Sequence, residues 1–185
     1  MITIAYKKST NKPIIEIDDN FKFCDPPKIS VIVGKNGSGK STLLRHFYQD
    51  TSCVYLPEEL ELPAEMKTTQ ILKLFGIKSI PKEQKEEIQK IETQEQEFKK
   101  LSKGNKQKLR LKCVLIQACQ RKKGMLFLDE PFSGLDKPSR AQTEETVAAI
   151  AETLPEMKIV VITHEPWNTS VGETISIEDG KIYSK

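Results

Sequence analysis

Short apolar runs alternate along the chain with longer polar stretches of helical period. The runs that indicate buried strands are Ile29–Val33, Cys53–Leu56, Met125–Leu128 and Ile159–Thr163. Near-continuous apolar runs of this length are typical of parallel strands that helices cover on both faces. The alternation predicts a layered α/β domain with a mainly parallel core sheet.

Antiparallel strands are expected at both ends of the chain. Ile2–Tyr6 and Ile14–Ile17 form a candidate strand pair around a polar turn. Thr174–Ile177 and Lys181–Tyr183 flank Asp179-Gly180, which is a strong hairpin signal. We therefore expect antiparallel strands in addition to the parallel core.

The middle of the chain has a different composition. From Lys82 to Lys100 almost every residue is a helix former, and Ile88, Ile91 and Phe98 fall on a narrow stripe. This pattern predicts a solvated helix with one buried edge. Since no linker and no internal repeat is recognisable, the chain is interpreted as one domain, residues 1–185, with a helical insert at about residues 60–115.

Composition narrows the class of protein. The chain has 185 residues, enough to bury a core, and a net charge of only +3, which gives no indication of a polyanion partner. No apolar run approaches the roughly 18 residues of a membrane helix, and the first ten residues lack an apolar signal core. Four cysteines without a CxxC pair indicate reduced thiols. We expect a cytoplasmic globular protein.

A glycine-rich loop follows the first predicted core strand. Residues 34–42 match the pattern GxxxxGK[ST] and precede a helix candidate, Lys40–Tyr48. Such a loop wraps polyphosphate in backbone N–H groups at a helix N-terminus, and its glycines let the backbone approach the anion. Lys40 adds a positive charge, and the Ser41 hydroxyl can ligate Mg²⁺. The candidate nucleotide-binding residues are Gly34, Lys35, Asn36, Gly37, Ser38, Gly39, Lys40, Ser41 and Thr42.

Two acidic residues, Asp129 and Glu130, end a later apolar strand. By themselves they could be a solvated strand end. Beside a phosphate loop, a carboxylate at the carboxyl end of a strand is placed to hold Mg²⁺, which is the role we assign to Asp129. Glu130 turns to the other side, where it can orient and deprotonate the attacking water.

At these residues the sequence resembles the ATP-binding-cassette (ABC) ATPases. Leu101–Gln107, LSKGNKQ, is similar to the family signature, LSGGQ in its commonest form. Ser133–Asp136, SGLD, is similar to the D-loop, and Thr163-His164-Glu165 resembles the segment of the switch histidine. The resemblance covers nearly the whole chain. It implies a P-loop NTPase fold of the ABC type that uses ATP and Mg²⁺.

The resemblance also implies roles for single residues. Ser102 and Gly104 would contact the γ-phosphate bound by another subunit, so the working unit would be a homodimer or a pair with a paralogous cassette. His164 would be a catalytic residue that senses the γ-phosphate, alongside Glu130. Asp136 would take part in communication across the dimer.

Two places depart from the family pattern. Glu58 stands where the family normally has a glutamine, and a carboxylate there can still reach Mg²⁺ through water. The stretch between Gly34 and Pro57 is short, so the antiparallel lobe usually carried there looks trimmed. Tyr6 is the best aromatic candidate for stacking on adenine, although a tyrosine in a strand core is an equal alternative.

The segment Lys99–Lys112 contains many basic residues and no acidic one. We interpret it as a solvated face near phosphate rather than a nucleic-acid site, because the net charge of the chain is low.

These features favour the ATP-binding and ATP-hydrolysing subunit of an ABC transporter. It would lie at the inner face of a membrane through a separate transmembrane permease, with no direct contact to nucleic acid. Two alternatives are a soluble non-transport ABC ATPase that acts on nucleic acid or the ribosome, and a nucleotide-dependent regulatory binding module. Lys40, Asp129, Glu130 and His164 argue against a module that only binds nucleotide.

Overall fold

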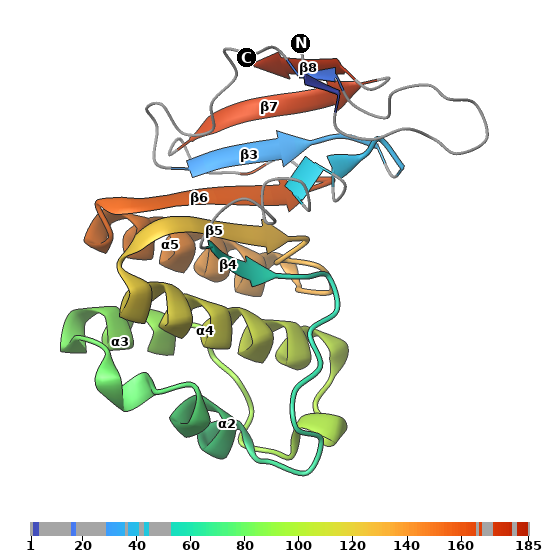
Figure 1. The fold of residues 1–185 in the computed structure, drawn as a ribbon. Coiled ribbons are helices and arrows are strands. Elements are labelled where there is room, and N and C mark those ends of the chain that lie inside the picture. Colours follow the sequence, from blue (N-terminus) through green and yellow to red (C-terminus); the bar gives the residue numbers. More distant parts are fainter. Residues whose placement is uncertain are drawn as a thin grey trace.

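A mixed sheet, with α4 and α5 packed against one of its faces, is the frame of the molecule (Figure 1). The computed structural model describes residues 2–3, 16–17, 29–35, 37–40, 43–44, 53–165, 167, 172–178 and 181–184. Its strands are β1 (Ile2–Thr3), β2 (Glu16–Ile17), β3 (Ile29–Val33), β4 (Cys53–Leu56), β5 (Lys123–Asp129), β6 (Glu156–Thr163), β7 (Glu173–Glu178) and β8 (Lys181–Ser184). Its helices are α2 (Thr68–Leu74), α3 (Lys82–Gln89), α4 (Lys103–Arg121) and α5 (Lys137–Thr153), with 3₁₀ turns at Ile77–Ser79 and Phe98–Lys100.

The order of the strands confirms the predicted parallel core. The sheet runs β1-β2-β8-β7-β3-β6-β5-β4, and neighbouring strands from β7 to β4 are parallel. The antiparallel pairs are β7 with β8 and β1 with β2, as predicted for the two ends of the chain. The predicted turn at Asp179-Gly180 lies outside the described residues.

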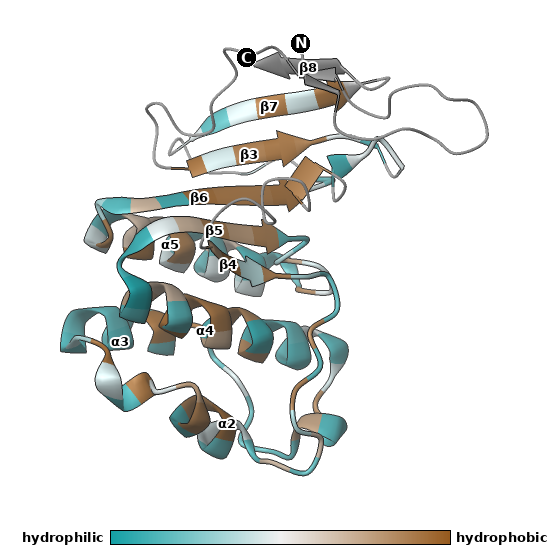
Figure 2. Cartoon of the chain, in the orientation of Figure 1, coloured by the Kyte–Doolittle hydropathy of each residue, from teal (hydrophilic) through white to brown (hydrophobic). Residues whose placement is uncertain are grey.

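Alternate side chains of the core strands fill two separate layers. On the helical side, Val31 of β3, Leu126 and Leu128 of β5 and Val161 of β6 pack against α4 and α5. On the other face, the buried cluster contains Ile32, Leu43, Leu44, Phe127, Val160, Ile162, Ile175 and Ile177. Figure 2 shows the central strands as mostly hydrophobic, which matches burial on both faces.

The predicted helix over Lys82–Lys100 is wrong beyond its first half. Helix α3 ends at Gln89, although Ile88, Ile91 and Phe98 are all buried as the stripe suggested. Neighbouring elements capture the carbonyl groups that follow: Lys112 Nζ donates to Ile91 O at 2.8 Å, and Thr68 Oγ1 donates to Gln94 O at 2.6 Å. Tertiary hydrogen bonds replace the helical ones there, and helix propensity is a weak prior against such contacts.

The helices between the two β-rich parts have a small core of their own. It consists of Leu62, Ile71, Phe98, Leu101, Leu109 and Cys113. The insert boundaries at about residues 60–115 remain a prediction, since α4 continues without interruption to Arg121. None of the helices from α2 to α5 has both the length and the apolar run that a bilayer span requires.

The basic segment Lys99–Lys112 is not a uniformly solvated face, contrary to the prediction. Lys112 is only 5% exposed. Arg110 donates from Nε to Leu60 O at 2.6 Å, and its guanidinium group lies 5.6 Å from the centre of the Phe98 ring. Part of this positive charge therefore holds the helical insert together.

Candidate active site

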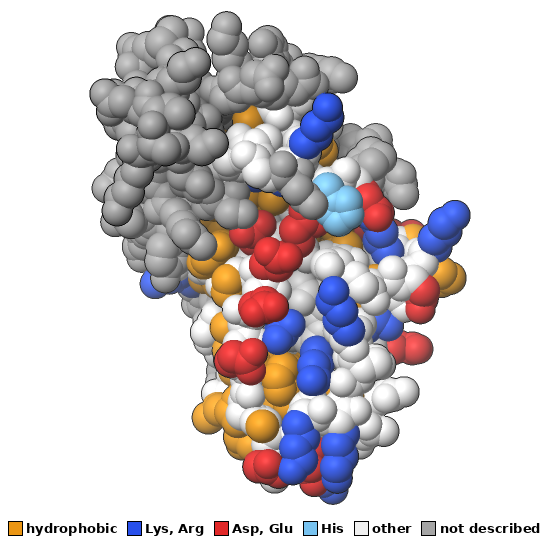
Figure 3. Space-filling view, turned by 90° about the vertical axis from the view of Figure 1, so that its right-hand side faces the viewer, with side chains coloured by type: hydrophobic (Ala, Val, Ile, Leu, Met, Phe, Trp, Pro, Cys, Tyr) orange, Lys and Arg blue, Asp and Glu red, His pale blue; other side chains and the backbone are white. Residues whose placement is uncertain are grey.

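The carboxyl ends of four parallel strands meet at one edge of the sheet, and the predicted site residues follow those ends. Val33 is in register with Thr163, and Leu56 with Leu128. The arrowheads of these strands point to the right in Figure 1, and Figure 3 views the molecule from that side. Acidic side chains gather beside the histidine on this face, and lysine and arginine side chains lie over the helical part (Figure 3).

The loop after β3 has the geometry of a phosphate loop. Gly37 and Gly39 adopt φ angles of 80° and 98°, which L side chains rarely adopt. A Cβ on Gly34 would lie 2.8 Å from both Ile177 O and Ser38 Oγ. Ser38 Oγ is buried without a hydrogen-bond partner among the described residues, which fits a loop built to receive acceptor oxygens. Asn36, Ser41 and Thr42 lie outside the described residues.

Lys40 lies inside this loop. Its Nζ donates to Gly34 O at 2.7 Å and to Lys35 O at 3.0 Å, and the residue is 7% exposed. Leu43 N–H donates to Gly39 O at 2.9 Å, so helical bonding begins directly after the loop. The rest of the predicted helix Lys40–Tyr48, apart from the helical Leu44, lies outside the described residues. The ammonium group is therefore held where phosphate oxygens would arrive, beside a helix N-terminus.

Asp129 ends β5 and is only 4% exposed. The hydroxyl of Tyr55, on β4, donates to its Oδ2 at 3.3 Å. Within the part of the chain that the structure describes, no three His, Cys, Asp or Glu side chains form a metal-binding group. The single carboxylate of Asp129 fits Mg²⁺, which commonly takes one or two carboxylates from the protein and completes its shell with phosphate and water. Zinc-type coordination would need more protein ligands than this.

Glu130 and His164 form a pair beside Asp129. Glu130 Oε2 lies 2.9 Å from His164 Nδ1, and both residues line a pocket of about 140 Å³. Burial raises the pKa of the Glu130 carboxyl above its ordinary value, and the nearby His164 opposes this effect. A half-buried carboxylate oriented by an imidazole is suited to accept a proton from water.

Arg140 also lines this pocket, and the sequence reasoning missed it. It forms an ion pair with Glu165, and its Nε donates to Glu144 Oε1 at 2.7 Å. Its guanidinium group lies 5.7 Å from the centre of the Phe132 ring. Arg140 and Glu144 are one helical turn apart on α5, a spacing that could have signalled their pair, but no local pattern points to Glu165.

Ser102 and Gly104 lie at the start of α4. Ser102 is the N-cap, and its Oγ accepts from Asn105 N at 3.3 Å and from Asn105 Nδ2 at 3.0 Å. A hydroxyl that accepts twice keeps its proton for donation elsewhere. A Cβ on Gly104 would lie 2.8 Å from Gly134 O, so the start of α4 packs directly on the 133–136 turn.

Three further residues were predicted to belong to the site: Asp136, Glu58 and Tyr6. Asp136 caps α5 and accepts from Ser139 N at 2.8 Å, and the hydrogen bonds from Ser139 hold the pKa of its carboxyl below the ordinary value. Glu58 is exposed, two residues after the end of β4. Tyr6 lies outside the described residues. The roles of Asp136, Glu58 and Tyr6 stay predictions.

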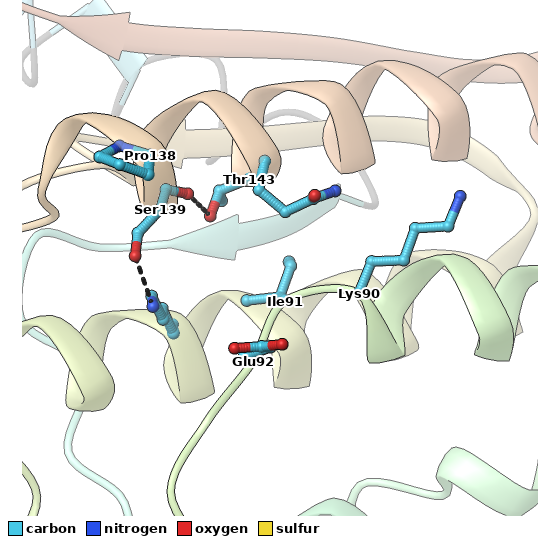
Figure 4. Close-up of a pocket in the computed structure, with 8 residues that line it drawn as sticks. Lys90, Ile91, Glu92, Pro138, Ser139 and Thr143 are labelled. Atoms are coloured by element: carbon cyan, nitrogen blue, oxygen red, sulfur yellow. Dashed lines mark hydrogen bonds between the residues drawn. The ribbon is translucent and has the colours of Figure 1, made fainter.

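A second pocket of about 250 Å³ lies away from this edge, between the end of α3, α4 and the first turns of α5. Figure 4 shows the side chains that line it, among them Ser139 and Thr143 of α5. Lys108 Nζ donates to Ser139 Oγ at 2.8 Å across this pocket. This contact fastens the second turn of α4 to the start of α5.

The chain is similar in sequence to ATP-binding proteins of ABC transporters. No protein-family model matches the chain. It is 29% identical over 150 residues to the uncharacterized ABC transporter ATP-binding protein YhaQ of Bacillus subtilis, covering 64% of this chain and 48% of YhaQ. It is 26% identical over 201 aligned residues to the manganese transport system ATP-binding protein MntB of Listeria innocua, covering 90% and 79% of the two chains. The ribosome protection protein VmlR of Bacillus subtilis is 30% identical over 151 residues, 73% of this chain but 27% of VmlR.

Solved structures share the fold. The dimeric cassette MJ0796 of a bacterial ABC transporter superposes with a TM-score of 0.63 at 17% identity, over 83% of this chain and 82% of the cassette. A chain in a model of ribosome-bound archaeal Pelota and ABCE1 gives a TM-score of 0.68 at 19% identity, over 85% of this chain and 29% of that chain. The chain spans about half the length of YhaQ and less than a third of VmlR, so these likenesses concern one domain.

Proposed function

We propose that this chain, which has the predicted α/β P-loop fold of the ABC ATPases, binds and hydrolyses ATP as a subunit of an ABC transporter. One observation carries the proposal. The loop with Lys40, the carboxylates Asp129 and Glu130, and His164 meet at one edge of the sheet. This is the set of groups that phosphoryl transfer to water requires.

Each residue has a defined task in the proposed reaction. Backbone N–H groups of the loop and Lys40 bind the phosphates, and Asp129, with Ser41, holds Mg²⁺, which neutralises charge on the phosphate oxygens when bound. Glu130 orients the attacking water and accepts its proton, while His164 fixes the carboxylate and faces the γ-phosphate. Ser102 and Gly104 complete the site of a second copy or of a paralogous cassette.

As a transporter subunit, this chain would have a membrane partner and a defined location in the cell. MntB is named as the ATP-binding protein of a manganese transport system, and by analogy we propose a separate membrane-spanning permease as the partner of this chain. We therefore propose a cytoplasmic position at the inner face of a membrane, with Glu58 and the helical insert toward the permease. No direct contact with nucleic acid is part of this proposal.

A soluble ATPase that acts on the ribosome is the second candidate. The identity to VmlR and the likeness to a chain from a ribosome-bound complex favour it. VmlR is much longer than this chain, which covers 27% of it. A polytopic membrane protein encoded next to this chain would favour transport over ribosome action.

Nucleotide binding is tested at Lys40. Replacing Lys40 with alanine is expected to weaken Mg-ATP binding about 10- to 150-fold, because a hydrogen bond to a charged group contributes about 1.5–3 kcal/mol. Isothermal titration calorimetry measures this directly. Lys123→Ala is the matched control, since Lys123 is exposed at the opposite end of β5. Equal affinities for wild type and Lys40→Ala would refute the assignment of the loop.

Completion of the site in trans is tested by mixing variants. Lys40→Ala and Ser102→Arg subunits should each be inactive alone, and their mixture should regain part of the ATPase activity. A heterodimer of these variants keeps one site with an intact Lys40 and an intact facing Ser102, as two-fold symmetry requires. Steady-state turnover of each variant and of the mixture measures this. Wild-type turnover that is independent of concentration in a monomeric protein would contradict it.

A further inference from the structure

Glu130 has an unusual backbone conformation. Its φ angle is 47°, in the left-handed region that non-glycine residues rarely occupy. Such a conformation persists only where surrounding contacts impose it, and it often occurs at functional sites. The direction in which the Glu130 side chain leaves the backbone therefore depends on what holds its peptide groups.

Three hydrogen bonds hold those peptide groups. Glu130 N–H donates to Ile162 O at 2.9 Å, which extends the contact of β5 with β6. Glu130 O accepts from Ser133 N at 3.2 Å and from Gln107 Nε2 at 3.1 Å. The first two bonds come from the sheet and the local turn, whereas Gln107 reaches Glu130 from α4.

Gln107 is placed to act on this turn. It is only 3% exposed, and it lies on the second turn of α4, the helix that begins at Ser102. One turn earlier, Gly104 packs against Gly134 O. The first two turns of α4 therefore contact both ends of the segment Glu130–Gly134.

We propose that Gln107 is a positioning residue. By donating to the main-chain carbonyl of Glu130, it fixes the direction in which the Glu130 carboxylate points. The same helix start presents Ser102 and Gly104 toward the partner's nucleotide, so Gln107 joins the surface that contacts one nucleotide to the carboxylate that acts on the other. A shift of α4 on engagement of the partner would be transmitted to Glu130. This inference rests on the proposed ATPase function.

The test removes the amide of Gln107 but keeps the volume of the side chain. Gln107→Met is expected to lower kcat for ATP about tenfold, the effect of one lost hydrogen bond of about 1.4 kcal/mol, with KM and ATP affinity unchanged. Lys108→Met is the control, because it removes the neighbouring contact of α4 with Ser139 and leaves the Glu130 bond intact. Its kcat is expected to stay within about twofold of wild type.

A double-mutant cycle separates positioning from general damage. In a Glu130→Gln background, Gln107→Met should cause little further loss of the residual turnover, because the group through which it acts is already removed. An equal fractional loss in both backgrounds would refute the proposal, as would wild-type kcat in Gln107→Met. If Gln107→Met lacks a cooperative thermal transition, Gln107→Asn, which keeps the amide on a shorter stem, takes its place with the same criteria. Absence of ATPase activity in wild type would instead refute the proposed function.

Discussion

Replacement of Glu130 by glutamine is expected to lower ATP turnover by about 10²–10⁴-fold, the usual contribution of a positioned general base. Glutamine keeps the size of the side chain and a hydrogen bond to His164, whose Nδ1 lies 2.9 Å from the carboxylate. It removes the negative oxygen that accepts the proton of water. ATP affinity should change little, because Lys40 and the loop are untouched. Single-turnover hydrolysis and calorimetry on the same variant separate the two effects.

The same variant should trap the dimer. Unhydrolysed ATP would join the loop of one subunit to the Ser102–Gly104 surface of the other, so light scattering with ATP should show a dimer for Glu130→Gln and mostly monomer for wild type after turnover. Glu83→Gln is the control, because Glu83 is exposed on α3, away from the site. Wild-type turnover in Glu130→Gln would refute the catalytic assignment while leaving the binding assignment intact.

The free energy of unfolding is expected to rise between pH 7 and pH 10, because the buried Lys112 loses its proton over this range in the folded protein. Burial lowers the pKa of this lysine from 10.5 to about 8, and its Nζ has Ile91 O as a partner at 2.8 Å. An unfolded chain restores a pKa near 10.4, so between about pH 8 and pH 10.5 the unfolded state binds more protons than the folded state. Stability then increases with pH, and the Lys112 contribution over this interval is about 2–3 kcal/mol.

Lys112→Met isolates this contribution. The free energy of unfolding of wild type should gain about 2–3 kcal/mol relative to Lys112→Met between pH 7 and pH 10, because methionine does not titrate. Urea denaturation at the two pH values measures the difference. Lys78→Met, which changes an exposed lysine, should keep the wild-type pH dependence. Identical pH profiles for wild type and Lys112→Met would show that Lys112 titrates normally.

The sequence allowed the core strands and the phosphate loop to be predicted because their signals are local. The apolar run before Gly34 and the glycines at 37 and 39 each specify backbone geometry within a few residues. Asp129, Glu130 and His164 were found because they directly follow predicted strands, and parallel strands end at a common edge. The roles of these residues in catalysis remain predictions that the experiments above address.

Contacts between distant segments could not be predicted in this way. Nothing near Gln107 in the sequence indicates that its amide reaches Glu130 O, 23 residues later. The end of α3 at Gln89 likewise depends on Lys112 and Thr68, which bond to the segment that follows. In each case a buried polar group is paired across the fold, and propensity carries no information about the partner.

The place of β3 in the sheet has a consequence for how the protein is made. This strand carries the nucleotide loop and is synthesised early, yet its neighbours on both sides, β6 and β7, come from the last third of the chain. A ribosome that has just produced the loop has not yet produced either flanking strand, so the apolar β3 stays unpaired until β6 and β7 have been made. Non-local pairing of this kind slows folding and exposes strand edges to other chains. We therefore expect the segment that carries β3 to be open to pairing with other chains until β6 and β7 are available.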